Sequence, residues 1–575
     1  MKKNTEILEK FRKFDGRLRA CQILTFFICF AIIAWLFLIM VVDVKNYKLK
    51  AKKQRNAQSF IMRGEIFDRN GEKLASDATS FNVYAHPGDY LHSPAELAKI
   101  LSPVLNIPEP KLTQMLSGNQ RIILLKKDAD RQTAVNVRKL QLREVSLDKK
   151  NERVYPQGRM AAHVLGYYDP DADITAGVEN TANNQLEDAE NPATFELTPS
   201  GDIIYNLTTN LEATIVPVKG KPLTLTLNNG IQHVCETELK KMIEDRHALR
   251  GAIIVIQPKT GEILAYSVYP DYDPNNFKAA TPLEKKNWTL TDVYPPGSTF
   301  KVLTLSAGIE SGKINENTKI EDTGTMKIGG WTLANYDVKK FPHPGIIDLY
   351  HLLEHSSNVG SAKIALMMDK QEYYNILKRF GVGSKTGIDL PSESSGLLPD
   401  YRGWGEAEQA SMGYGYGAST TFIQMATFMA ALANGGVRIT PHVIKYSDEE
   451  KAKKITETPI MSPETAKTVT KLLAGSIGRS KVPVNLDDFN VAAKTGTSLK
   501  PNEGGKGYTN QMYTSVMGFF PAFDPQVMIY VVIDSAQGAE VWGNTVASPV
   551  FREVALQIAR ILNIQPDKVK PTAKT

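Results

Sequence analysis

The chain has 575 residues, of which 42% are hydrophobic and 23% are charged. This balance is normal for a globular protein, and the length predicts two or three domains. The formal net charge of +6 is mild, and no stretch interleaves dense Lys and Arg with aromatic residues as a nucleic-acid groove would. We therefore expect no nucleic-acid partner.

The first element in chain order is an apolar segment at residues 23–42 that contains no charged side chain. A helix of this length is about sufficient to cross a ~30 Å hydrocarbon core. No small-residue cleavage site follows it, so the segment predicts an uncleaved transmembrane anchor. Basic residues lie on both sides of the segment, so the positive-inside rule does not orient it.

Turn-rich segments follow the apolar segment. Residues 63–71 include an Asn-Gly pair, which is typical of a tight turn between short strands. Residues 153–166 and 176–179 have a similar non-repetitive character, and residues 184–222 are polar without clear periodicity. We interpret residues 43–222 as a first domain, with an irregular connection or loosely built stretch at residues 184–222.

A second domain is predicted at residues 223–565, followed by a tail at residues 566–575. Its apolar runs predict strands at both ends, with mainly helical segments between about residues 301 and 432. Such an order predicts an α/β domain whose sheet joins distant parts of the chain. The expected strands are 223–227, 251–257, 262–269, 490–497, 515–520 and 527–534, with helices at 230–245 and 549–562.

Three short motifs carry the chemistry of this domain. In chain order they are Ser-x-x-Lys at 298–301, Ser-x-Asn at 356–358 and Lys-Thr-Gly-Thr at 494–497. Lys-Thr-Gly also occurs at Lys259, where a preceding proline and the glycine indicate a turn, and at Lys385, within a glycine-rich loop. Only the copy at Lys494 lies within a predicted strand, residues 490–497.

The first motif places a base beside a hydroxyl. Residues three apart on a helix share a face, so we expect Lys301 beside the hydroxyl of Ser298. A serine needs a neighbouring base to become nucleophilic, and a lysine can be that base if desolvation or another cation keeps it neutral. In isolation, however, Ser-x-x-Lys is more often a solvated helix start.

The second motif is predicted to lie on a turn between two helices. A hydroxyl at Ser356 can pass a proton to a leaving amine, and the amide of Asn358 can hold a substrate carbonyl. The nearby His351 and His355 invite a Ser-His-Asp interpretation. We reject it, because the chain has no Gly-x-Ser-x-Gly elbow and histidines one helical turn apart more often pack or face water.

The third motif is predicted on a strand. Gly496 would let a ligand approach the backbone closely, so an edge strand here could pair with a peptide substrate. Lys494, Thr495 and Thr497 could hold the terminal carboxylate of that peptide. We expect no cofactor and no metal ion in this mechanism.

The three motifs and their flanks resemble the class B penicillin-binding proteins, the monofunctional peptidoglycan transpeptidases. The resemblance covers nearly the whole chain, including residues 63–71 and 153–166, which are similar to the pedestal motifs of the family. It implies a β-lactamase-like transpeptidase domain on an elongated α+β pedestal, the pedestal being residues 43–222. The same resemblance implies that Ser298 is the acyl-ester nucleophile and Lys301 its base. It also implies an oxyanion site between the backbone N–H groups of Ser298 and Thr497.

Within the family, residues 410–417 with Thr421 and Gln424 look more like the septal, division-specific type (FtsI-like) than the elongation type. Two different activities are also compatible with the same motifs. A D,D-carboxypeptidase would transfer the same acyl group to water, and a membrane-anchored β-lactam sensor or scaffold would keep the fold without turnover. All polar residues of the three motifs are present, which disfavours the sensor.

The resemblance also predicts partners and location. We expect stem peptides that end in D-Ala-D-Ala as substrates, covalent binding of β-lactams, and a separate lipid II-polymerising glycosyltransferase of the shape, elongation, division and sporulation family, with other divisome proteins. Because peptidoglycan lies outside the inner (cytoplasmic) membrane, residues 1–22 are expected to be a cytoplasmic tail. The catalytic domain is then periplasmic or extracellular.

Overall fold

The computed structural model describes residues 23–33, 35, 56–58, 61–169, 172, 174–188, 194–196, 218–480, 482–502, 504 and 507–568. Residues 23–33 are helical and their side chains are exposed. Within the described ranges, no helix is both long and apolar enough to cross a membrane. The remaining residues of the predicted anchor, 34 and 36–42, lie outside the described residues. The predicted N-terminal tail and residues 569–575 also lie outside them.

The chain divides into two compact units. The first contains residues 1–62, 79–150 and 189–219, and the second contains residues 63–78, 151–188 and 220–575. The divisions at residues 78 and 150 fall within two long strands, β4 (Lys73–Ala85) and β6 (Val145–Val154). The sequence predicts a single boundary at residue 222, between the pedestal and the second domain, whereas each compact unit consists of several separate segments. The boundary at residue 222 stays a prediction.

The first unit has its own small core, formed where helices pack on strands. Helix α3 (Pro94–Leu105) begins at a capping box, because the Ser93 hydroxyl accepts from the Glu96 N–H and the Glu96 carboxylate accepts from the Ser93 N–H. Leu97 and Leu101, one turn apart, are fully buried in this core. The other elements that build the core are α4 (Glu109–Leu116), β5 (Ile123–Ala129) and α5 (Arg131–Lys139).

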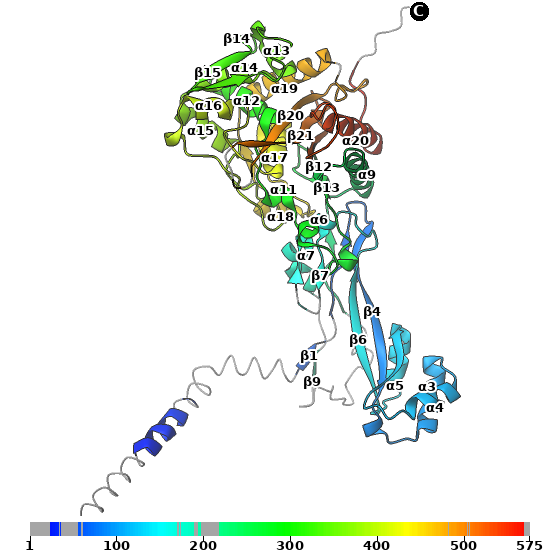
Figure 1. The fold of residues 1–575 in the computed structure, drawn as a ribbon. Helices are drawn as coiled ribbons and strands as arrows, with labels where there is room; N and C mark the ends of the chain where they lie inside the picture. The colour runs from blue at the N-terminus through cyan, green and yellow to red at the C-terminus, as the bar shows by residue number, and fades with distance from the viewer. Residues whose placement is uncertain are drawn as a thin grey trace, which may run out of the picture. The chain divides into compact units, whose positions relative to one another are not determined.

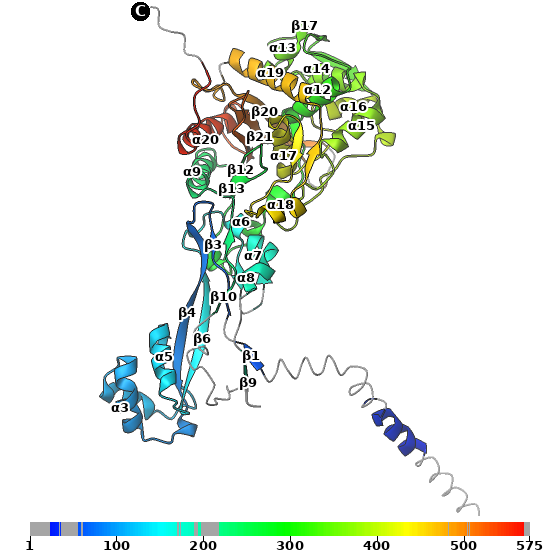
Figure 2. The same ribbon diagram turned by 180° about the vertical axis from the view of Figure 1, so that it is seen from behind.

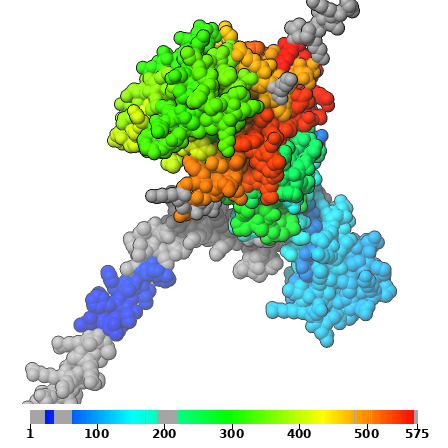
Figure 3. Space-filling model, turned by 45° about the horizontal axis from the view of Figure 1, so that its top comes forward, coloured from blue at the N-terminus to red at the C-terminus, as the bar shows by residue number. Residues whose placement is uncertain are grey.

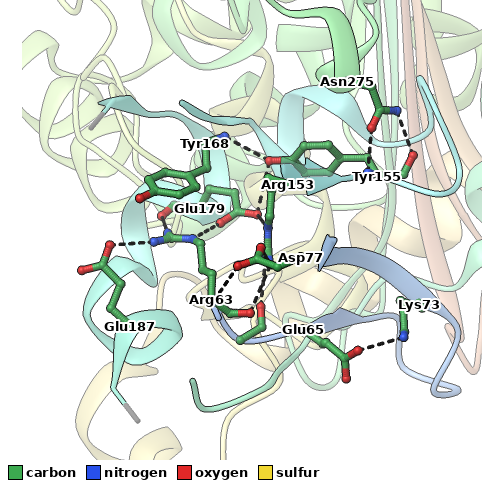
Figure 4. A network of polar contacts seen from close by, with 11 residues as sticks. Arg63, Glu65, Lys73, Asp77, Arg153, Tyr155, Tyr168, Glu179, Glu187 and Asn275 are labelled. Atoms are coloured by element: carbon green, nitrogen blue, oxygen red, sulfur yellow. Dashed lines mark hydrogen bonds and ion pairs between the residues drawn. The ribbon is translucent and has the colours of Figure 1, made fainter. Parts of the chain in front are cut away.

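The second unit includes a buried ion cluster formed by the turn-rich segments of the pedestal (Figure 4). Arg153 donates to Glu179 Oε1 at 2.7 Å and forms an ion pair with Asp77 at 2.9 Å, and Arg63 contacts Glu179 Oε2 at 2.5 Å. Arg153 also donates to the carbonyl oxygen of Gly64 at 2.9 Å. The two guanidinium groups therefore have carboxylate or carbonyl partners, as buried charges require.

The rest of the second unit is built on a five-stranded antiparallel sheet with the order β13-β12-β22-β21-β20. Its outer strand β20 pairs only with β21 among the described strands, so the prediction of an edge strand at Lys494 is confirmed. The strands are β12 (Arg250–Ile256), β13 (Ile263–Tyr269), β20 (Ala492–Pro501), β21 (Tyr508–Phe520) and β22 (Val527–Asp534).

Helices cover both faces of this sheet (Figures 1 and 2). On one face, Ile253 and Val255 of β12 pack with α9 (Asn229–Asp245) and α20 (Ala547–Ile561). On the other face, Tyr530 of β22 stacks on Phe422, the first residue of α17 (Phe422–Ala433), with ring centroids 4.7 Å apart. The alternating strand residues thus bury two apolar faces, and the predicted α/β class is confirmed.

A mainly helical lobe lies beside the sheet and includes the large green to yellow-green surface at the upper left of Figure 3. It contains α12 (Lys301–Glu310), α13 (Leu349–Glu354), α14 (Asn358–Met367), α15 (Lys370–Arg379) and α16 (Glu406–Gly413), and α19 (Pro463–Arg479) packs against α12 and α13. Four short strands between residues 319 and 348 were missed by the prediction of a mainly helical block. Each has only four residues and is partly exposed, so its hydrophobic pattern is too short to detect; they are β14 (Lys319–Asp322), β15 (Thr325–Ile328), β16 (Trp331–Ala334) and β17 (Gly345–Asp348).

Candidate active site

Ser298 lies on a short 3₁₀ turn, Gly297–Phe300, that continues directly into α12. Gly297 has φ +59°, and a Cβ there would lie 2.9 Å from the carbonyl oxygen of Thr497. Only glycine therefore lets this turn pack closely against β20. The Ser498 hydroxyl donates to the Pro295 carbonyl at 2.7 Å and holds the same two segments together.

Lys301 is 1% exposed and extends from the first turn of α12 toward the Ser-x-Asn turn. Its Nζ contacts the Ser356 carbonyl oxygen, and lies 3.1 Å from Ser356 Oγ and 2.7 Å from Asn358 Oδ1. Within the described part of the chain, no side-chain hydrogen bond joins Lys301 to Ser298 Oγ. The direct pairing of Ser298 with Lys301 therefore stays a prediction.

The Ser-x-Asn turn connects α13 to α14, as the sequence predicts. Ser356 has φ +51°, a left-handed conformation that is strained for a residue with a Cβ. Ser357 is the N-cap of α14, where its hydroxyl accepts from the Gly360 N–H at 2.8 Å and donates to Asp322 Oδ2 at 2.5 Å. The cap and its acidic partner hold Ser356 in this strained position.

Asn335, which follows β16, is a positioning residue that the sequence did not reveal. Its side-chain oxygen accepts from the N–H groups of Asn358 at 2.9 Å and Val359 at 3.1 Å. Its amide donates to both oxygens of Asp322 at 3.0 and 2.9 Å. In the sequence, Asp-x-Gly at residues 322–324 indicates only a turn. Nothing in the sequence therefore linked Asp322 or Asn335 to the Ser-x-Asn motif, which lies more than 20 residues further along the chain.

Lys494 enters the same cluster from the sheet. It is 3% exposed, and its Nζ lies 3.1 Å from Ser356 Oγ and 3.0 Å from the Thr495 carbonyl oxygen. The Ser356 hydroxyl is therefore the point at which Lys301 and Lys494 meet. All three motifs lie in one compact unit, and hydrogen bonds join the last two through Lys494 and Ser356.

The glycine of the third motif allows close packing around the edge strand. A Cβ on Gly496 would lie 2.8 Å from Thr299 Cγ2, beside the nucleophile turn, and 2.5 Å from Ser515 Oγ. Thr497 Oγ1 accepts from the Gly543 N–H at 3.0 Å, which ties β20 to the loop before α20. Thr495 and Thr497 are both partly exposed, so their side chains are available to a ligand.

The surroundings of the cluster lower the pKa of both lysines. Burial is the largest cause that lowers the pKa of Lys301 well below its ordinary value, and the positive charge of Lys494 lowers it further. The Asp322 and Asp337 carboxylates act in the opposite direction without cancelling the shift. Burial also lowers the pKa of Lys494, to about 7. A neutral Lys301 can accept a proton, and a protonated Lys494 can bind an anion.

The two other Lys-Thr-Gly copies lie outside this cluster. Lys259 is in the turn between β12 and β13, where Gly261 has φ +76° and the Lys259 side chain pairs with Asp524 at 2.9 Å. Lys385 is exposed in a loop, and the neighbouring Thr386 donates to Glu393. The interpretation of both copies as turn and loop segments is confirmed.

Comparison with protein families gives two matches along the chain. Residues 251–556 match the model of the penicillin-binding protein transpeptidase domain. Residues 60–225 match the model of the penicillin-binding protein dimerisation domain. The match to the transpeptidase model contains Ser298, Ser356 and Lys494, so the matched region is the one in which the three motifs assemble.

Individual relatives agree with the family matches. The chain is 30% identical to a probable peptidoglycan D,D-transpeptidase PenA of Neisseria gonorrhoeae, over 88% of this chain and 85% of the relative. It is 28% identical to the peptidoglycan D,D-transpeptidase FtsI of Escherichia coli K12, over 93% of this chain and 89% of the relative.

A solved structure gives the same fold. Penicillin-binding protein 2X from Streptococcus thermophilus aligns with a TM-score of 0.73 at 23% identity, over 89% of this chain and 81% of that one, and at this identity the likeness shows the fold alone. The relatives and the two domain matches, however, cover both the transpeptidase region and the segment before it. The chain therefore belongs to the penicillin-binding protein transpeptidases, and its dimerisation domain places it among the class B members, which are serine-type D-Ala-D-Ala transpeptidases.

Proposed function

We propose that Ser298 is the residue that forms the acyl-enzyme in peptidoglycan cross-linking. Its Oγ attacks the carbonyl carbon of the penultimate D-Ala of a stem peptide, which forms an ester bond and breaks the amide bond to the terminal D-Ala. The proton of the hydroxyl passes to Lys301 and then to the departing amine of D-Ala. The amine of a second stem peptide then attacks the ester, which forms the cross-link and frees Ser298.

The observation that carries this proposal is the meeting of two buried lysines at the Ser356 hydroxyl. Among the described residues, neither Lys301 nor Lys494 has a carboxylate partner within ion-pair distance. Burial without such a partner favours the neutral amine, which is the form that accepts a proton. Ser356, in contact with both amines, is placed to relay the proton to the leaving group.

The other site residues bind the substrate in this proposal. Asn358 holds a substrate carbonyl or amide, and the edge strand β20 pairs with the peptide backbone across Gly496. Lys494, Thr495 and Thr497 bind the terminal carboxylate. The backbone N–H groups of Ser298 and Thr497 stabilise the oxyanion, a contribution of about 3–4 kcal/mol per donor where single donors have been removed from a serine hydrolase.

Fluorescent penicillin tests the acyl-enzyme directly. A β-lactam carbonyl takes the place of the stem-peptide carbonyl, so we expect one covalent label per chain in the wild type and none in Ser298→Ala. Ser411→Ala, which removes an exposed hydroxyl that bonds only its own helix backbone, is the matched control and should label normally. Failure of the folded wild type to label would contradict the proposal.

The choice between cross-linking and hydrolysis needs a separate measurement. The purified chain should release D-Ala from a D-Ala-D-Ala stem peptide and transfer the remaining acyl group to an added amine. Mass spectrometry distinguishes the products. Transfer to the amine supports a transpeptidase, whereas release of the free acid alone would show a D,D-carboxypeptidase. Penicillin labelling without either product would show a β-lactam sensor.

We further propose a role in septal cell-wall synthesis. The support is the resemblance of residues 410–417, with Thr421 and Gln424, to the division-specific type. A tagged copy in dividing cells should gather at the division site. An even signal along the sidewall would instead show an elongation-specific enzyme of the same class.

The proposed reaction also sets the location of the chain. Its substrate lies outside the cytoplasmic membrane, so the catalytic domain faces the periplasm or cell exterior and residues 23–42 form the anchor. A lipid II-polymerising glycosyltransferase is the expected partner, because the proposed reaction only cross-links existing strands. Protease added outside spheroplasts should digest the catalytic domain, and full protection would contradict this orientation.

A further inference from the structure

A cluster of possible metal ligands lies outside the three motifs, at the end of α13. His351, Glu354 and His355 each offer one ligand atom, and these atoms lie within 4.8 Å of one another. The two imidazole rings are one helical turn apart and nearly parallel, with centroids 4.2 Å apart. Glu354 is exposed and the histidines are partly exposed, so an ion from solvent can reach the cluster.

The donor set suits zinc. Two imidazole nitrogens and one carboxylate oxygen are common zinc ligands, and three protein ligands leave the fourth tetrahedral position to water. With metal–ligand bonds of about 2.0–2.2 Å, tetrahedral donors lie roughly 3.3 Å apart. These donors lie within 4.8 Å of one another, so side-chain rotations that bring them closer by up to about 1.5 Å and turn the two rings toward a common point would close the site.

A fourth side chain approaches the cluster from a different segment. Asp337 lies after β16, is 10% exposed at its side chain, and places Oδ2 3.3 Å from His355 Nδ1. Its backbone carbonyl accepts from the N–H groups of Lys340 and Phe341, and the Phe341 ring packs edge-on against His355. Metal-binding histidines usually have a carboxylate partner of this kind, which fixes the ring orientation.

The cluster lies directly before the Ser-x-Asn turn. His355 is covalently joined to Ser356, whose left-handed backbone the surrounding contacts must maintain. We propose that His351, Glu354 and His355, with Asp337 orienting His355, form a binding site for Zn²⁺ that braces this turn. The sequence already places His351, Glu354 and His355 on one side of a helix through their spacing, but only the fold brings Asp337 to them.

The test measures metal binding and does not depend on catalysis. Purified chain at pH 7.5, stripped of metal by chelation, is titrated with Co²⁺ while visible absorption is recorded, and Zn²⁺ is then added as competitor. We expect one Co²⁺ per chain with the absorption of a four-coordinate site, and displacement by Zn²⁺. Absence of such a one-to-one site in the folded wild type would overturn the proposal.

Variants locate the site. His351→Ala should weaken binding at least 100-fold, and Asp337→Asn should weaken it 10- to 100-fold, because it removes the partner that orients His355. His343→Ala is the matched control, since His343 is exposed in the preceding loop and outside the cluster. Unchanged affinity in both test variants, or equal loss in His343→Ala, would contradict the assignment.

Two further readouts on the wild type cover the case in which a variant does not fold. Zn²⁺ should raise the melting temperature, because an ion that binds only the folded state stabilises it. It should also slow hydrogen exchange in the peptide that spans residues 351–358. Unchanged exchange there, at a Zn²⁺ concentration that saturates the chain, would show that the ion does not brace the turn.

Discussion

The second unit contains two buried clusters of ionisable side chains, and they differ in whether their cationic groups have carboxylate partners. In the pedestal cluster, Arg63 and Arg153 share Glu179 at 2.5 and 2.7 Å, and Asp77 pairs with Arg153 at 2.9 Å. In the catalytic cluster, Lys301 and Lys494 meet at a hydroxyl and have no ion pair among the described residues. One cluster is balanced in charge, whereas the other is not.

The pKa shifts follow from this difference. Burial alone would lower the pKa of Arg153, but the Glu179 and Asp77 carboxylates more than compensate and raise it. Burial lowers the pKa of Lys301, and Lys494 lowers it further. Paired buried charges stay charged and hold segments together, whereas a buried lysine without a carboxylate partner loses its proton more readily and, at Lys301, can act as a base. The comparison therefore separates a structural cluster from a chemical one.

The largest expected effect is the loss of the proposed base. Lys301→Met keeps most of the side-chain volume and removes the proton acceptor, so the rate of acylation by benzylpenicillin should fall about 10²–10⁴-fold. The free energy of unfolding should fall by only about 1–3 kcal/mol, because hydrogen bonds to the Ser-x-Asn turn are lost but no ion pair is. Stopped-flow acylation and urea denaturation measure the two quantities. Lys313→Met, on the exposed surface after α12, is the control and should change neither.

The opposite pattern is expected in the pedestal cluster. Arg153→Met removes the buried ion-pair partner of Asp77 and leaves Glu179 with Arg63 alone, which should lower the free energy of unfolding by about 3–5 kcal/mol. Arg159→Met is the matched control, because Arg159 pairs with Asp271 in an exposed position, and it should cost less than about 1 kcal/mol. Equal losses in the two variants would contradict the claim that the buried ion pairs of Arg153 stabilise the fold.

A smaller effect should follow from the positioning residue behind the catalytic turn. Asn335→Ala removes the acceptor of the Asn358 and Val359 N–H groups, so acylation should slow about 10- to 100-fold through misplacement of the turn. The slope of the pH–rate profile should stay that of the wild type, since Lys301 is unchanged. Asn317→Ala, at an exposed loop position, controls for the substitution. A wild-type rate in Asn335→Ala would show that the turn holds its shape without this contact.

The smallest expected effect concerns the backbone of Ser356. Glycine adopts φ +51° without strain, so Ser356→Gly should be more stable to unfolding than Ser356→Ala by up to about 1 kcal/mol. Both variants lack the hydroxyl, so both should acylate slowly. Thermal unfolding compares their stability, and an alanine variant as stable as the glycine variant would show that the turn stores no strain.

Much of the site could be predicted from the sequence, because order and spacing separate Lys494 from the copies at Lys259 and Lys385. The α/β class and the edge strand also follow from local apolar patterns. The roles of Asn335 and Asp322 could not be predicted, and neither could the approach of Lys301 to Ser356. These contacts join segments that are more than 20 residues apart in the sequence, and the local sequence around Asn335 and Asp322 indicates only turns. The four short strands between residues 319 and 348 were missed for a different reason, because a pattern of four residues is too brief to detect.

The pH dependence of acylation tests the central claim most directly, namely that the unpaired buried lysines give the site its chemistry. Lys494 with a pKa of about 7 loses its positive charge as the pH rises through 7, so the second-order rate constant with benzylpenicillin should decline above that pH. In Lys494→Arg, which stays charged, the decline should disappear. A wild-type profile that stays flat from pH 6 to 9, or one that Lys494→Arg leaves unchanged, would contradict the account.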